Sequence, residues 1–321
     1  LGLSGNYFHN GFIRTEKSTK TVQNALAVVT DTYGRNRWDD EYEDEYGLKF
    51  FAEHKFEKKD HKVRLEFSNS KAPEVEDNHY TDLYWFPTAP NQYDNTLIKQ
   101  TEGKNELTID YSDPLSEEST LEAGYAGEVN SRDMDFYGEF FDQSRKVFVK
   151  DVAASNRFLF DETIHALYAT YEQSFGSFGM MAGLRAEQSS VKSNLVTLDS
   201  SISNSHFSLF PTVHFSYKLN EAAEARISYS RRTHRPEGDD LNPFPVYRDP
   251  RNISSGNPKL LPEYVHSVEL GCKFETDQFS LFPALYYRYT YDRFTSITRP
   301  LNDSTLLTTR TNLASDQSLG V

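Results

Sequence analysis

The sequence predicts an all-β protein, an antiparallel up-and-down transmembrane β-barrel of about twelve strands. Three observations predict this fold. Apolar and polar residues alternate one by one over long segments, short polar turns alternate with longer connections, and aromatic residues are abundant in a chain that is polar on average. Successive side chains of a strand point to opposite faces, so a strand between lipid and a polar interior carries this alternation.

The clearest alternating segment runs from Phe207 to Lys218. Every second residue from Phe207 to Tyr217 is apolar, and the residues between them are mostly polar. Comparable alternation is found at 121–126, 180–187, 267–274 and 281–292. Tyrosines that suit the lipid headgroup level lie near the expected strand ends, at Tyr171, Tyr217, Tyr229, Tyr287 and Tyr291.

The connections between strands follow a second rhythm. Short turns are expected near 57–61, 113–118, 174–177, 220–222, 275–278 and 314–318. Longer connections are expected near 9–44, 71–96, 131–157, 195–204, 234–263 and 295–303. Strict alternation puts the short turns on one rim and the long loops on the other, as in outer-membrane barrels. A soluble β-sandwich shows similar alternation but has strands of about 5–6 residues, so the barrel is favoured.

The composition agrees with a barrel and excludes other classes. The 321 residues carry 34 Lys and Arg against 48 Asp and Glu, a net charge of −14, and mean hydropathy is −0.68. Aromatic residues make up 14%, which argues against a globally disordered acidic chain, and the negative charge argues against a nucleic-acid-binding protein. The sequence contains no run of about 18 apolar residues, which is the length that a membrane-spanning helix needs. A barrel needs apolar residues only on its lipid face, so a polar average is compatible with it.

One segment carries a more specific pattern than alternation. In order along the chain it contains Tyr229-Ser230-Arg231-Arg232, Arg235-Pro236, Asp240-Leu241-Asn242-Pro243-Phe244, Asp249-Pro250, Gly256-Asn257-Pro258, Leu261-Pro262-Glu263-Tyr264 and Glu269-Leu270-Gly271. This segment closely resembles the outer-membrane β-barrel family of TonB-dependent receptors in Gram-negative bacteria. The remainder of the chain resembles that family mainly through its rhythm of strands and turns.

The resemblance implies a receptor in the outer membrane that captures a scarce solute. In that family a plug domain fills a barrel of about 22 strands, and the TonB complex of the inner membrane drives uptake. A plug, a signal peptide and an aromatic C-terminal strand are not recognisable here, so residues 1–321 are expected to form a partial barrel. The expected partners are outer-membrane lipid and lipopolysaccharide, the TonB complex through the plug, and an unknown solute, but no nucleic acid. The alternatives are a small porin-like diffusion pore and a soluble β-rich surface or binding protein.

An acidic run is the first candidate site. Six carboxylates fall within seven residues, at Asp39, Asp40, Glu41, Glu43, Asp44 and Glu45. Carboxylate oxygens suit Ca²⁺ or another divalent ion, although the spacing and glycine of an EF-hand are missing. The alternative interpretation is a solvated stretch of an acidic loop.

Basic and aromatic residues form the second group of candidates. Arg231, Arg232, His234 and Arg235 lie where a strand enters the long connection, and they could bind a carboxylate or phosphate of a ligand. They could equally pair with acids of the loop. Tyr84 and Trp85, expected in the 71–96 loop, could stack on a planar or sugar ligand, or pack within that loop.

A third group is expected on the lumen faces of the strands. It consists of Arg185, Glu187, Arg226, Glu269 and Arg288. In a receptor these side chains could contact the plug, and the alternative is that they form salt bridges with one another across adjacent strands. The sequence contains no zinc-protease, nucleophile-elbow or P-loop motif, so we expect no enzyme and no cofactor beyond the divalent ion considered above.

Overall fold

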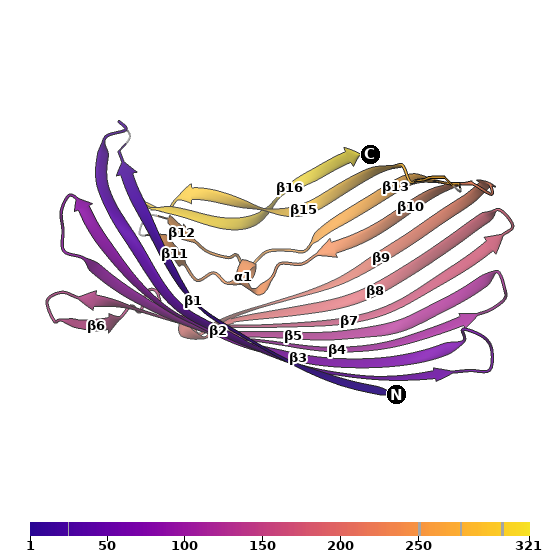
Figure 1. Ribbon diagram of the computed structural model, residues 1–321, viewed down its shortest axis with the longest axis horizontal. Helices are drawn as coiled ribbons and strands as arrows, with labels where there is room; N and C mark the ends of the chain where they lie inside the picture. Colours follow the sequence, from indigo (N-terminus) through magenta and orange to yellow (C-terminus); the bar gives the residue numbers. More distant parts are fainter. Residues whose placement is uncertain (25, 250–251, 277, 303–304) are drawn as a thin grey trace.

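The computed structural model describes residues 1–24, 26–249, 252–276, 278–302 and 305–321. Within these residues the chain forms one large curved sheet that wraps around a concave face (Figure 1). Neighbouring long strands are antiparallel throughout. No helix of the described residues is long and apolar enough to cross a membrane.

Twelve long strands follow one another in the sheet in chain order, which confirms the expected all-β meander. They are β1 (Gly2–Gln23), β2 (Val29–Lys55), β3 (Lys62–Phe86), β4 (Gln92–Pro114), β5 (Ser119–Asp142), β7 (Asn156–Phe175), β8 (Phe178–Leu195), β9 (Ser200–Asn220), β10 (Ala223–His234), β13 (Glu263–Glu275), β15 (Ala284–Pro300) and β16 (Leu306–Gly320). The short elements are β6 (Val147–Lys150), η1 (Val196–Leu198), α1 (Gly238–Leu241), β11 (Val246–Asp249), β12 (Asn252–Ser254) and β14 (Ser280–Leu281).

The strands are longer than the sequence predicted. Most of the expected long connections are in fact strand, because β2 has 27 residues and β3 has 25. The turn expected at 314–318 is also wrong, since these residues belong to β16. Beyond the lipid both faces of a strand meet water, so the alternation of hydropathy fades there while the backbone pairing continues. Among the described residues, the expected long connection at 234–263 is the one that is largely irregular.

Large apolar side chains lie on the convex face of the sheet. Phe215 of β9 pairs with Ile227 of β10, which pairs with Leu270 of β13, which pairs with Leu285 of β15. All four are exposed, Leu270 to 51%. A contiguous apolar patch on this scale is typical of a surface that meets lipid rather than water.

The apolar band ends well below the upper ends of β1 and β2. On the convex face of β2, apolar residues alternate from Ala52 to Tyr46 and are followed by Asp44. The ring of Tyr46 lies 5.2 Å from that of Tyr7 on β1, and His9 follows Tyr7 on the same face. Tyrosine rings are typical of the headgroup level of a transmembrane barrel, so we expect the parts of β1 and β2 beyond Tyr7 and Tyr46 to extend above the membrane.

The pairing of β10 with β13 ends at one height of the wall. The register pairs His234 of β10 with Glu263 of β13, and it pairs Tyr264 of β13 with Tyr291 of β15, which precedes the left-handed residue Asp292, whose φ is 54°. From this height the described residues 235–249 and 252–262, called here the inward-folded loop, turn into the concavity (Figure 1). There Leu241 and Leu260 pack against residues of β7, β8 and β15 in a buried cluster completed by Phe158, Phe160, Leu195 and Phe294.

Candidate functional site

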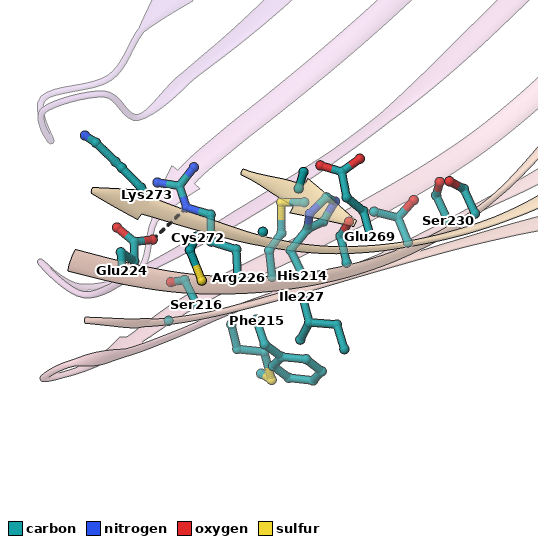
Figure 2. A pocket seen from close by; sticks show the side chains of 18 of the residues that line it. His214, Phe215, Ser216, Glu224, Arg226, Ile227, Ser230, Glu269, Cys272 and Lys273 are labelled. Carbon is teal, nitrogen blue, oxygen red and sulfur yellow. Dashed lines mark hydrogen bonds and ion pairs between the residues drawn. The ribbon is translucent and has the colours of Figure 1, made fainter. Parts of the chain in front are cut away.

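The concave face of the sheet, called here the lumen face, is the candidate functional surface. Its cavity over β7–β10, β13 and β15 has a volume of about 1080 Å³. Figure 2 shows Glu224, Arg226 and Glu269 on this side of the sheet, whereas Phe215 and Ile227 point the opposite way. One strand therefore presents charge to the lumen and apolar groups to the outside, as the alternating sequence predicted.

The five residues predicted on the lumen face are all placed there by the register. Arg226, Glu269 and Arg288 line the cavity, and Arg226 pairs with Glu224 at 2.8 Å. Arg185 and Glu187 lie on β8 and pair with each other at 3.0 Å. The ion pairs join residues two apart on the same strand, whereas the sequence interpretation expected pairs across neighbouring strands. Their predicted contact with a plug domain stays a prediction.

The inward-folded loop is fixed to the wall by ion pairs. Arg132 on β5 lies 3.0 Å from Asp239, and Arg310 on β16 lies 2.6 Å from Asp240. Arg235 forms an ion pair with Glu187 and lies 3.8 Å from Glu162 on β7. Burial lowers the pKa of the Arg235 guanidinium below its usual range, while Glu162 acts in the opposite direction. These pairs tie the loop to β5, β7, β8 and β16.

Hydrogen bonds and close packing within the inward-folded loop also fix its shape. Leu241 and Asn242 close the short helix α1, and the Gly256 amide donates to the carbonyl oxygen of Asn242 at 2.8 Å. A Cβ on Gly256 would lie 2.6 Å from three carbonyl oxygens, those of Asp239, Asp240 and Asn242. Gly256 and the residues of α1 therefore pack closely together inside the lumen. Asp249 lies in β11, and Pro250 lies outside the described residues.

The four basic residues predicted as a cluster are separated by the fold. Arg231 lies on the convex face, where it donates to the Leu209 carbonyl at 2.8 Å and to the Tyr291 hydroxyl at 2.6 Å. Its guanidinium also lies over the Tyr264 ring. Arg232 is exposed and lines the cavity, whereas Arg235 is engaged with Glu187. The prediction that these residues form a single basic site is therefore wrong, because successive residues of a strand face opposite sides of the sheet.

His234 completes the predicted basic group. It lines the cavity, and its Nδ1 lies 3.4 Å from the Glu263 carboxylate. Of the four basic residues, Arg232 and His234 are thus the pair that reaches the cavity. Glu263 also accepts a hydrogen bond from the Phe294 amide at 2.8 Å, which links β13 to the inward bend of β15.

Tyr84 and Trp85 are not in a loop, because β3 continues to Phe86. Tyr84 stacks on Tyr33 with ring centroids 5.3 Å apart. The indole of Trp85 instead covers Gly34, where a Cβ would meet it at 2.9 Å. Neighbouring residues of a strand point to opposite faces, so the two rings do not form one stacking platform.

The acidic run also lies in a strand rather than in a loop, in the upper part of β2. Its members therefore alternate between two faces. Asp40 and Asp44 are on the convex side, where Asp44 contacts His9 at 2.9 Å. Asp39 and Glu41 are on the lumen face, and their carboxylate oxygens lie within 4.8 Å of an oxygen of Glu76 on β3. Glu43 and Glu45 occupy the next lumen-facing positions of β2. Glu76 was not among the residues predicted from the sequence. It follows Glu41 by 35 residues in the chain, and only the pairing of β2 with β3 brings the two side chains together.

These features define the class of the protein as a membrane β-barrel wall with a charged lumen face. The chain belongs to the outer membrane protein beta-barrel family, whose model matches residues 54–321. Its location is the outer membrane of a Gram-negative bacterium. A comparison with curated proteins found no matching sequence.

Two solved structures show the same fold. The copper transporter OprC is 11% identical with a TM-score of 0.51, over 99% of this chain and 56% of that one. A double mutant of the hemophore receptor HasR of Serratia marcescens, in complex with hemophore HasA and heme, is 11% identical with a TM-score of 0.53, over 98% of this chain and 60% of that one. The chain thus spans little more than half of these proteins, and its wall matches about half of a TonB-dependent receptor barrel.

Proposed function

We propose that the chain is the barrel portion of a TonB-dependent receptor that takes up a scarce solute with energy from the inner membrane. The observation that carries this proposal is the inward-folded loop, held inside the lumen by Arg132, Arg235 and Arg310. A diffusion pore needs a continuous water-filled channel, which a loop anchored inside the lumen narrows, whereas a receptor that is opened by energy can keep its lumen obstructed between transport events. The structural similarity to a copper transporter and a hemophore receptor supports the same class.

The proposal includes a plug domain and further strands. In the full-length protein they would complete the barrel, and the plug would reach the TonB complex. Outer-membrane lipid and lipopolysaccharide would surround the convex face. The solute would pass along the lumen face, where Arg232, His234, Glu269 and Arg288 line the cavity. The solute is taken up rather than converted, so no catalytic role is assigned to these side chains.

The first experiment distinguishes a receptor from a pore without knowledge of the solute. The full-length protein is reconstituted into planar lipid bilayers, and the ionic conductance is compared with that of protein-free bilayers and of a porin. We expect no steady conductance above that of the protein-free bilayer. A steady conductance of the size that an open porin gives would favour the diffusion pore and contradict the proposal.

The second experiment tests the energy coupling. The full-length receptor in detergent is passed over the immobilised periplasmic domain of TonB from the same bacterium. We expect specific retention, and competition by the soluble domain should abolish it. A folded receptor, judged by its altered gel mobility before heating, that is not retained would contradict energised uptake. The fold itself would then still stand.

A further inference from the structure

The upper lumen face of β2 and β3 concentrates carboxylates in direct opposition. Glu41 pairs with Glu76 across the two strands, and Glu43 pairs with Glu74 one step lower. Like charges directly opposite each other on one face of a sheet are destabilising. The site lies above the apolar band of the wall, on strand positions that continue beyond Tyr46. The repulsion calls for a compensating cation.

Two arginines provide part of that compensation. Arg37 lies 2.9 Å from Oδ2 of Asp39 and 3.6 Å from Oε2 of Glu76. Arg14 of β1 lies 3.8 Å from Oδ2 of Asp39 and 3.2 Å from Oε2 of Glu41. These contacts all use the same oxygen of each carboxylate, which leaves Oδ1 of Asp39 and Oε1 of both glutamates for another partner.

The unused oxygen of Asp39 is the observation that points to a ligand. The Asp39 side chain is 0% exposed, and its Oδ1 is buried without a hydrogen-bond partner. A buried carboxylate oxygen without a partner is costly, because it has lost its water and gained nothing in return. Asp39, Glu41 and Glu76 each offer an oxygen, and these oxygens lie within 4.8 Å of one another.

We propose that Asp39, Glu41 and Glu76 bind one Ca²⁺ ion on the lumen face above the membrane. Ca²⁺ accepts six to eight oxygen ligands at about 2.3–2.6 Å in flexible geometry, so three carboxylates with water complete its shell. Three carboxylates exceed the two arginines by one negative charge, and Glu43 and Glu74 add two more nearby. The ion would bridge β2 and β3 and relieve the opposition of Glu41 and Glu76.

Only some residues of the acidic run belong to the proposed site, because alternate residues of β2 face opposite sides of the wall. Asp40 lies between two ligands but faces the convex side, where it pairs in register with Asp77. Asp40→Asn is therefore a matched control for Glu76→Gln, because each removes one carboxylate charge at the same height of the wall. Glu76→Gln also leaves Arg37 paired with the buried Asp39.

The test is calorimetric titration of the full-length protein in detergent with CaCl₂. We expect one binding event with a dissociation constant of about 0.1–1 mM, which is typical of extracellular calcium modules. Glu76→Gln should weaken this event by about tenfold or more, through the loss of one charged ligand, and Asp40→Asn should leave it within about twofold. Altered gel mobility before heating checks that each variant is folded, and Glu41→Gln replaces Glu76→Gln if that variant fails to fold.

Three results would overturn the proposal. The first is a wild-type protein that binds no Ca²⁺ up to about 10 mM, well above the extracellular range. The second is a folded Glu76→Gln or Glu41→Gln variant that binds like the wild type. The third is an equal loss in Asp40→Asn, because it would assign the effect to the overall charge of the wall.

Discussion

The guanidinium of Arg132 on β5 lies 3.0 Å from the carboxylate of Asp239 in the inward-folded loop. The same arginine lies 3.2 Å from Glu102 on β4 and donates to Gln100 at 2.9 Å. Arg132 therefore connects the long strands β4 and β5 to the loop that enters the lumen between β10 and β13. This contact makes the position of the loop dependent on strands far away in the sequence.

Replacement of Arg132 by alanine should loosen the loop without unfolding the wall. Asp239 is largely exposed, so the pair contributes about 1 kcal/mol, which corresponds to about fivefold faster amide exchange in α1. Hydrogen exchange of the full-length protein measures this change. Arg157→Ala is the control, because Arg157 pairs with Asp133 at 2.8 Å and faces away from the loop. Equal effects of both variants on α1 would contradict the anchoring role.

The apolar cluster should contribute more than the ion pair. Leu260 is 2% exposed within the cluster, and truncation to alanine should destabilise the loop by about 2–5 kcal/mol through the lost packing and the cavity. Leu261 is next in the chain but 44% exposed, so Leu261→Ala should change stability by less than about 0.5 kcal/mol. Limited proteolysis within 235–262 would report the difference. Resistance of Leu260→Ala equal to that of Leu261→Ala would show that the loop is not held by this cluster.

The two faces of β10 lead to a third prediction. Ile227 faces outward and should meet lipid, so Ile227→Arg should destabilise the folded barrel by about 2–4 kcal/mol if it lies near the bilayer midplane. Ser228 lines the cavity, and Ser228→Arg should cost less than about 1 kcal/mol, because the lumen is aqueous. Urea unfolding of the full-length protein in lipid vesicles compares the two. A larger penalty for Ser228→Arg would reverse the assignment of the faces.

The alternation of residue types was sufficient to predict the fold and its faces. The predicted lumen positions Arg185, Glu187 and Arg226 are on the concave side, because period two requires no knowledge of the neighbouring strand. The upper parts of the strands could not be predicted in the same way. There both faces are wet, and residues such as those from Asp39 to Glu45 resemble a polar loop although they are paired.

The composition of the candidate sites depended on the register between strands. Arg235 and Glu187 were assigned to different groups by sequence, yet they form an ion pair, because the loop returns to β8. Arg231 and Arg232 were assigned to one group, yet they lie on opposite faces of β10. Glu76 joins Asp39 and Glu41 through pairing of β2 with β3. Such contacts are tertiary and leave no local pattern.

The central claim is that the strands span a membrane with one face in lipid and the other in an aqueous lumen. Spin labels placed singly at each position from 224 to 230 of the full-length protein, with Cys272 replaced by alanine, measure it directly. We expect oxygen, which partitions into lipid, to relax labels at 225, 227 and 229 most strongly. A water-soluble nickel complex should instead relax labels at 224, 226, 228 and 230. Equal accessibility to the nickel complex at all seven positions would contradict the claim.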